Sequence, residues 1–308
     1  MNSRKFQRIA VVMGGPSTER EVSLKSGSAI ADALETAGYE VRRFELTEAT
    51  LPDLGDAQAV FVAIHGAYGE DGGIQTDLET RGIPYIGTRA ADMPTSMDKV
   101  VSRDVLAEAD LPIAPGQVLP AGLDESIIAF PCVVKAPNQG SSIGISVVRE
   151  GPEAAAHFAA AVELSRSFEP TVLVEQFIDG REFTVGLLGA DDDSLQPLPV
   201  VEICAPNGTY DFDAKYEYKH GRTEYKVPAP IPDELAAECQ RLAVAAMCAV
   251  GGRHLGRVDF RVDQQNRPYI LEFNSIPGFT ATSLLPKAAA EAGIPFPELC
   301  SRIIEMAE

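Results

Sequence analysis

The chain has 308 residues, a length that predicts two or three domains rather than one small core. Its composition, with 45% apolar and 23% charged residues, is typical of a folded globular protein and excludes a disordered one. The net charge of −19 disfavours binding to nucleic acid or to an anionic membrane surface, and no apolar run is long enough to span a bilayer.

The N-terminal part of the chain predicts a parallel sheet covered by helices. An apolar run ends at Gly14-Gly15, which is typical of a strand that stops at a turn. Strand patterns then alternate with helical periodicity, an order that favours a Rossmann-like α/β domain in residues 1–88. The expected elements are a strand at 8–13, a helix at 22–37, strands at 41–46 and 59–64, and a helix at 73–81.

The rest of the chain predicts two further parts, residues 89–178 and residues 179–308, that mix helices and strands. The first is expected to contain helices at 98–109 and 152–166 and strands at 116–119, 131–136, 143–148 and 171–176. The second is expected to contain strands at 182–189, 197–203, 256–263 and 267–274 and helices at 232–250 and 295–306.

Cysteine and histidine usage indicates a reducing compartment. Five cysteines occur without a CxxC pair, so free thiols are expected, and four scattered histidines argue against a zinc site. The basic N-terminal residues are followed by only a short apolar stretch, which does not make a signal peptide. We therefore expect a cytoplasmic protein with no nucleic-acid or membrane partner.

Two strands near the C-terminus carry the strongest chemical signal. Because side chains alternate along a strand, Arg257 and Asp259 share one face of the strand at 256–263. Glu272 and Asn274 likewise share one face of the strand at 267–274. The residues expected on the opposite faces are Val258, Phe260, Leu271 and Phe273.

The same strands predict a metal site if they form a hairpin. A turn centred on Gln265-Asn266 places Asp259 opposite Glu272 and Arg257 opposite Asn274. Two carboxylates that face each other repel, and a divalent cation between them removes that cost. Asp, Glu and Asn oxygens are the ligands that Mg²⁺ prefers. A solvated strand face is the alternative for any one of these residues, and the joint pattern disfavours it.

A Gly/Ser-rich loop follows a lysine in the middle of the chain. Lys135 ends an apolar strand, and the loop 138–144 follows two residues later. Backbone N–H groups of such loops cradle phosphate oxygens, and the lysine adds a positive charge. A plain hairpin turn is the alternative interpretation, and the sequence contains no Walker A motif.

Polar residues also follow two strands of the N-terminal domain, where open α/β sheets bind ligands. Glu19 comes after the strand at 8–13, and His65 comes directly after Ile64. Stabilisation of a helix N-terminus is the alternative role for Glu19, and a structural role is the alternative for His65. The aromatic and charged loop 210–216 predicts either a lid or a self-packed surface loop.

Together these segments resemble the D-alanine–D-alanine ligase family of the ATP-grasp superfamily, in the family's order and from end to end. The GRVDF and E-x-N pieces alone indicate only an ATP-grasp protein, whereas the first and last segments are specific to the ligase family. The matching segments are GGPSTEREVSLKSG (14–27), AIHGAYGEDGGIQ (63–75), PYIGT (84–88), SMDK (96–99), GSSIGIS (140–146), YDFDAKY (210–216), GRVDF (256–260) and LEFNSIPGFTATSLLP (271–286).

The resemblance implies a fold and a reaction. The fold is a Rossmann-like N-terminal domain, residues 1–88, followed by a two-part ATP-grasp fold in residues 89–178 and 179–308. ATP phosphorylates the carboxylate of one D-alanine, and the amine of a second D-alanine attacks the acyl phosphate. The dipeptide then enters peptidoglycan synthesis. The resemblance also implies two Mg²⁺ or Mn²⁺ ions and a homodimer formed through the N-terminal domain.

The family's substrate roles carry over onto matching residues. Glu19 is expected to hold the ammonium of the first D-alanine, and Ser141 and Tyr216 to hydrogen-bond with Glu19 and close the lid loop. His65 is expected near the first substrate, and Ser283 is expected to receive the carboxylate of the second.

The family's roles toward ATP, metal and oxyanion carry over in the same way. The oxyanion of the tetrahedral intermediate is expected to be stabilised by Arg257 and the backbone N–H of Gly278. The metal ligands are expected to be Asp259, Glu272 and Asn274. The residues expected to bind ATP are Lys99, Lys135, Ser142, Glu175, Gln176, Phe177, Ile178, Glu182, Lys215 and Leu271, of which Lys215 is also placed at the substrate.

Three positions, Thr209, Ser275 and Phe279, depart from the family's usual residues. Other functions also stay open at this point. The first alternative is another ATP-grasp carboxylate–amine ligase or a D-alanine–D-lactate ligase. A nucleotide-binding regulatory module without turnover is expected to lack a metal ligand or the oxyanion arginine, and a periplasmic-type amino-acid receptor is expected to carry an export signal.

Overall fold

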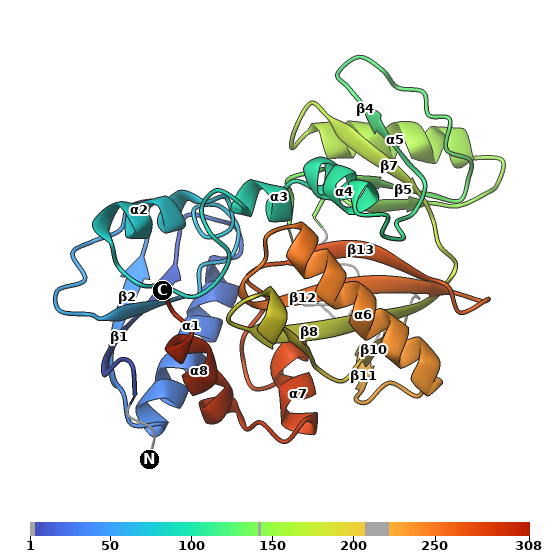
Figure 1. Cartoon of the computed structure of the whole chain (residues 1–308). Helices are drawn as coiled ribbons and strands as arrows, with labels where there is room; N and C mark the ends of the chain where they lie inside the picture. Colours follow the sequence, from blue (N-terminus) through green and yellow to red (C-terminus); the bar gives the residue numbers. More distant parts are fainter. Residues whose placement is uncertain (1–3, 141–142, 207–221) are drawn as a thin grey trace.

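The computed structural model describes residues 4–140, 143–206 and 222–308 (Figure 1). It is a mixed α/β structure, as predicted, with one parallel and two antiparallel sheets over these residues. The division at residues 88 and 178 stays a proposal. No helix in the described ranges is long and apolar enough to cross a membrane.

The N-terminal sheet is parallel and has the strand order β2-β1-β3 over the described residues. β1 is buried along nearly all of its length because helices cover both faces of the sheet. The carboxyl ends of β1 and β3 lie side by side, which brings Glu19 and His65 to one edge. The elements are β1 (Arg8–Gly14), α1 (Arg20–Thr36), β2 (Glu40–Leu46), β3 (Ala59–Val62) and α2 (Gly73–Arg81).

The central part forms an antiparallel sheet with the order β4-β7-β5-β6, and helix α5 packs on it. Phe158 and Val162 of α5 share a core with Val134 and Val174 of the sheet. The elements are α3 (Met93–Met97), α4 (Lys99–Glu108), β4 (Gly116–Leu119), β5 (Cys132–Lys135), β6 (Ser146–Val148), α5 (Ala154–Arg166) and β7 (Val172–Gln176).

The C-terminal part has the strand order β11-β10-β8-β12-β13, with β9 paired to β8, within the described ranges. Its helices are α6 (Asp233–Ala249), α7 (Leu284–Glu291) and α8 (Phe296–Glu305), and η1 (Asp192–Ser194) is a short 3₁₀ turn. The strands are β8 (Gly180–Gly189), β9 (Gln196–Pro197), β10 (Val201–Cys204), β11 (Glu224–Lys226), β12 (His254–Asp263) and β13 (Pro268–Asn274).

The two faces of this sheet differ in character, which positions the site. Val258 and Phe260 of β12 pack with α6 in one apolar core. Arg257 and Asp259 therefore lie on the opposite face, as the alternation predicted. Toward the N-terminal domain, that second face becomes apolar again and packs against α7.

The predicted hairpin register is right at its functional end and wrong near its turn. Asp259 pairs with Glu272 and Arg257 with Asn274, as predicted. The register shifts by one between Asp259 and Phe260, and Phe260 pairs with Ile270. Leu271 is the extra residue of this β-bulge. The prediction that Leu271 shares the buried face with Phe273 is therefore wrong, since Ile270 lies in the core and Leu271 is only partly buried.

Other differences concern short elements. The strand expected at 197–203 is interrupted, so that β9 and β10 replace it, and the strand expected at 59–64 ends at Val62. The sequence patterns missed α3, β11 and α7. Helix α8 was predicted, and it packs on α1, so that Ile303 and Ile304 share a core with Ile30 and Leu34 of the N-terminal domain.

Candidate active site

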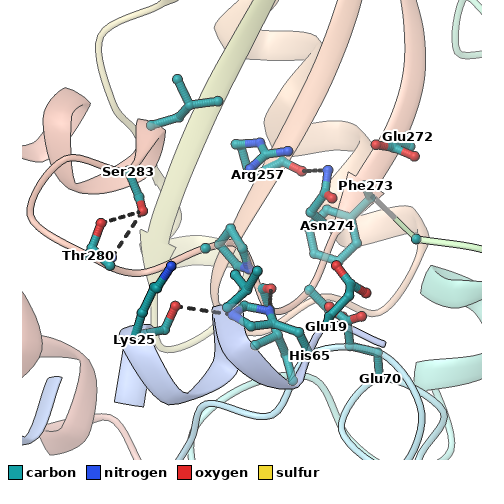
Figure 2. A pocket seen from close by; sticks show the side chains of 18 of the residues that line it. Glu19, Lys25, His65, Glu70, Arg257, Glu272, Phe273, Asn274, Thr280 and Ser283 are labelled. Atoms are coloured by element: carbon teal, nitrogen blue, oxygen red, sulfur yellow. Dashed lines mark hydrogen bonds between the residues drawn. The ribbon is translucent and has the colours of Figure 1, made fainter. Parts of the chain in front are cut away.

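A cavity of about 890 Å³ lies where the three parts of the chain meet (Figure 2). Of the residues that line it, the N-terminal part contributes Glu19, Lys25, Ser26, His65 and Glu70; the central part contributes Lys99, Gln139 and Gly140; and the C-terminal part contributes Arg257, Glu272, Asn274, Gly278, Ser283 and Lys287. The cavity therefore brings together most of the residues that the sequence placed near the reacting groups.

A buried hydrogen-bond chain fixes His65 and joins the N-terminal domain to the loop after β13. His65 Nδ1 lies 3.0 Å from the carbonyl oxygen of Ile276, so Nδ1 carries a proton. Burial lowers the pKa of His65, which favours the neutral ring. Nε2 then accepts from Ser26 Oγ at 3.2 Å, and Ser26 Oγ accepts from the backbone N–H of Phe279 at 3.1 Å. These hydrogen bonds hold the loop that contains Gly278 in place.

Glu70 is a second carboxylate beside Glu19, and the sequence analysis did not assign it to the site. One of its oxygens accepts from the backbone N–H of Gly66 at 2.7 Å, and Figure 2 shows its side chain next to Glu19. Burial raises the pKa of Glu70 to about 8, and the negative charge of Glu19 adds to the effect. The two carboxylates form an acidic end of the cavity that suits a cationic group.

The raised pKa of Glu70 predicts a pH-dependent stability. The unfolded chain releases this proton near pH 4.5, whereas the folded chain holds it up to about pH 8, so stability falls as pH rises between these values. We expect Glu70→Gln to raise the melting temperature over wild type at pH 8.5, by about 2 °C or more, and to change it little at pH 5. Thermal unfolding without ligand measures this, with the exposed Glu21→Gln as control. An equal shift at both pH values would contradict the assignment.

The candidate metal ligands lie on adjacent strands, and cationic groups surround them. Asp259 Oδ1 and Oδ2 accept from Arg257 Nε and a terminal guanidinium nitrogen at 2.8 and 2.7 Å. Asn274 Nδ2 lies 3.1 Å from Asp259 Oδ2, and Lys99 Nζ lies 3.8 Å from Glu272 Oε2. The donor set of two opposed carboxylates and one amide oxygen fits a hard divalent cation. Over the described residues, no group of three or more His, Cys, Asp or Glu forms a metal cluster, so such an ion would need further ligands from a bound nucleotide.

The loop after β13 brings two hydroxyl groups to the other end of the cavity. Ser283 precedes α7, and its Oγ accepts from the backbone N–H of Thr280 at 3.0 Å. The Thr280 hydroxyl lies 3.0 Å from the same oxygen. Gly278 lies in this loop and lines the cavity. A Cβ on Gly278 would be 3.6 Å from Ser283 Oγ, so the glycine and the serine are close neighbours.

The Gly/Ser-rich loop approaches the N-terminal wall. A Cβ on Gly140 would be only 2.8 Å from Glu19 Oε2, so the absence of a side chain permits this approach. Lys99 Nζ donates to the carbonyl oxygen of Gln139 at 2.8 Å in the same loop. The predicted site residues Ser141, Ser142, Lys215 and Tyr216 lie outside the described residues.

Among the residues predicted to bind the nucleotide, Lys99 lines the cavity, whereas Lys135, Glu175, Gln176, Phe177, Ile178 and Glu182 lie outside its lining, on or next to β5, β7 and β8. Lys135 and Arg103 both form ion pairs with the buried carboxylate of Glu175. The backbone N–H groups of Gln176 and Phe177 donate to the carbonyls of Pro115 and Pro131, so any contact with a base must use other backbone groups of this segment. Leu271 lies on β13, which pairs with β12 in the C-terminal sheet.

Glu182 and Ile178 meet a common partner at the start of β8. The guanidinium of Arg261 lies 3.3 Å from Glu182 Oε2, and its Nε donates to the carbonyl of Ile178 at 3.2 Å. The same guanidinium carbon lies 5.2 Å from the centroid of the Phe177 ring. Arg261 thus organises three of the residues expected near the nucleotide.

Comparison with known proteins decides the family. A family model described as "D-ala D-ala ligase C-terminus" matches residues 120–305. A D-alanine–D-alanine ligase of Bordetella parapertussis is 40% identical over 99% of this chain and 96% of its own length. The chain belongs to the D-alanine–D-alanine ligase family.

Solved structures agree with this membership. A D-alanine–D-alanine ligase from Bacillus anthracis, complexed with ATP, is 31% identical, with a TM-score of 0.81 over 97% of both chains. The VanG D-Ala:D-Ser ligase from Enterococcus faecalis is 26% identical, with a TM-score of 0.83 over 98% of this chain and 99% of its own. These relatives confirm the predicted ATP-grasp fold.

In this D-alanine–D-alanine ligase family member, the sequence analysis assigned no role to three polar residues on the N-terminal side of the cavity, Lys25, Ser26 and Glu70. Lys25 and Ser26 belong to the segment 14–27 that carried the resemblance, and Glu70 belongs to the segment 63–75. A helical projection of α1 could have found the first two, because Val22, Lys25 and Ser26 share one face with spacing i, i+3, i+4. Glu70 lies in the loop between β3 and α2, where no periodicity applies.

Proposed function

We propose that the cavity is the active site in which two D-alanine molecules are joined, with the residue roles given below. Membership of the D-alanine–D-alanine ligase family makes ATP-dependent formation of D-alanyl-D-alanine, a precursor of peptidoglycan, the activity of this chain. The observation that carries the proposed site is the opposed Asp259–Glu272 pair beside Arg257, on the sheet face next to a cavity that also holds Glu19.

The acidic end of the cavity binds the first D-alanine. Glu19 and Glu70 present carboxylates to its ammonium, and the ammonium removes the repulsion between them. The neutral ring of His65, held by Ser26 and Ile276, borders the same space and adds no positive charge that would repel the ammonium. Ser141 and Tyr216 close the site toward Glu19.

Residues on β12, β13 and α4 neutralise the negative charge of the phosphoryl group, either directly or through bound cations. Asp259, Glu272 and Asn274 hold two Mg²⁺ or Mn²⁺ ions, which when bound neutralise the phosphate oxygens of ATP. Lys99 lies beside Glu272 and adds a positive charge. Nucleotide contacts come from Lys135, Ser142, Glu175, Gln176, Phe177, Ile178, Glu182, Lys215 and Leu271, and Lys215 also reaches the substrate.

Arg257 and Gly278 stabilise the negative oxygen that forms when the second amine attacks. The guanidinium is nearly buried, which strengthens its interaction with a developing charge. Ser283, at the opposite end of the cavity from Glu19, receives the carboxylate of the second D-alanine. We also infer, from family membership alone, a cytoplasmic homodimer formed through the N-terminal domain.

A product assay tests the function. With ATP, Mg²⁺ and D-alanine, we expect phosphate release together with dipeptide formation. Mixtures of D-alanine with L-alanine, D-serine or D-lactate then show which second substrate is used. We expect D-alanyl-D-alanine to be the dominant product in each mixture. Dominant D-alanyl-D-lactate at pH 7 would move the chain to the depsipeptide-forming ligases.

Replacement of Glu19 tests the first-substrate site. Glu19→Gln keeps the shape of the side chain and removes its charge, so we expect D-alanine binding to weaken about tenfold to a hundredfold. ATP binding should change little, because Glu19 lines the cavity and the nucleotide segment 175–178 does not. Calorimetry with each ligand measures both. Equal weakening for both ligands would assign Glu19 to the helix N-terminus instead.

A further inference from the structure

Two lysines, Lys25 and Lys287, line the cavity together with Ser283, and none of the roles above is assigned to them. Lys25 projects from α1 on the face that also carries Val22 and Ser26. Lys287 lies on α7 four residues after Ser283, so both side chains are on the same side of that helix and both line the cavity. Two lysines from two different parts of the fold therefore line the same cavity as Ser283.

The positions of these lysines point to an anion. Figure 2 shows the ammonium of Lys25 extended toward the hydroxyls of Thr280 and Ser283. Lys287 Nζ lies 4.4 Å from the centroid of the Tyr225 ring, and burial lowers the pKa of Lys287. Neither lysine forms an ion pair with a carboxylate among the described residues. The ring attracts the ammonium and leaves its charge unneutralised.

The cavity as a whole is polarised. Glu19 and Glu70 lie at one end, and Lys25 lies with Ser283 and Thr280 at the other (Figure 2). A free dipeptide is a zwitterion whose ammonium and carboxylate lie at opposite ends of a short chain. The charges of the cavity are complementary to that distribution and oppose the reverse orientation.

We propose that Lys25 and Lys287 determine specificity for a free carboxylate on the second amino acid and on the dipeptide product. This inference rests on the proposed function and adds two residues to it. The two ammonium groups flank the carboxylate that Ser283 receives, and they form charge-assisted hydrogen bonds that an amide or ester cannot match. Both lysines act only as positive charges and hydrogen-bond donors. They neither take up nor release a proton during the reaction.

Binding of the product and of its C-terminal amide tests this proposal without turnover. For wild type with ADP and Mg²⁺, calorimetry should show D-alanyl-D-alanine binding at least about tenfold more tightly than D-alanyl-D-alaninamide. Lys25→Met and Lys287→Met should each weaken dipeptide binding about tenfold and leave amide binding nearly unchanged. The double variant should lose the preference, whereas Lys25→Arg and Lys287→Arg should retain most of it.

Kinetics and a control complete the test. The methionine variants should raise the KM for D-alanine at the second site, with the KM for ATP unchanged. Lys226→Met is the matched control, because Lys226 follows Tyr225 but pairs with Glu202 outside the cavity. Equal binding of the dipeptide and its amide by wild type would overturn the proposal, and this result does not depend on whether a variant folds. A double variant that still prefers the dipeptide over the amide would also overturn it. Wild type that forms no dipeptide would instead overturn the proposed function.

Discussion

Replacement of Glu272 by glutamine should reduce turnover by about a hundredfold or more at saturating ATP and Mg²⁺. Glu272 faces Asp259 across the hairpin and lies 3.8 Å from Lys99, so it is placed to bind a cation between the strands. Glutamine keeps the shape but removes the charge that a divalent cation needs. Phosphoryl transfer depends mostly on positioning and charge neutralisation, so the loss should appear in kcat.

The experiment compares kcat for phosphate release and for dipeptide formation across a Mg²⁺ titration. Glu298→Gln is the control, because Glu298 forms an exposed ion pair with Arg302 on α8 and has no part in the site. The control should behave as wild type. Activity of Glu272→Gln close to wild type at saturating Mg²⁺ would remove Glu272 from the metal ligands.

Arg257→Lys should lower kcat by about a hundredfold to a thousandfold, the usual cost of losing an oxyanion donor. A lysine keeps the charge but cannot reproduce the two parallel hydrogen bonds that Arg257 makes to Asp259. Asp259 then loses its fixed partner, and the buried carboxylate is less well compensated. The variant should therefore be impaired in chemistry and also less stable.

Thermal unfolding and ATP binding separate these two effects. If ATP binding by the folded variant stays near wild type while kcat falls, the arginine acts on the chemical step. Arg241→Lys is the control, since Arg241 makes a similar two-bond pair with Glu238 on the exposed side of α6. A kcat within a few-fold of wild type would show that Arg257 does not stabilise the oxyanion and only holds Asp259 in place.

The hairpin shows what the sequence predicts well. Period-two alternation is a local property, so the shared face of Arg257 and Asp259 and the pairing of Asp259 with Glu272 could be read before the structure was known. The bulge at Leu271 could not, because one extra residue near a turn changes neither the alternation nor the turn signal beyond it. The predicted register therefore fails only between the bulge and the turn.

Other features depend on contacts between distant parts of the chain. Ser26 bonds to Phe279, which is 253 residues away, and no local pattern indicates that pairing. Helix α7 was not predicted, and it carries a proline, Pro286, at its third position. Proline is tolerated there because the N–H groups of a first helical turn have no partner within the helix. The raised pKa of Glu70 likewise arises from burial and from Glu19, both set by tertiary structure.

The packing of α8 on α1 has a consequence for the order of folding. On the ribosome, α1 and the N-terminal sheet emerge early, but Ile30 and Leu34 find their partners Ile303 and Ile304 only at the end of synthesis. Until then, the nascent N-terminal part exposes an apolar surface to which chaperones bind and through which the chain can aggregate. Removing residues 296–308 should therefore unfold the part of the protein farthest from the cut in sequence, the domain that holds Glu19 and His65.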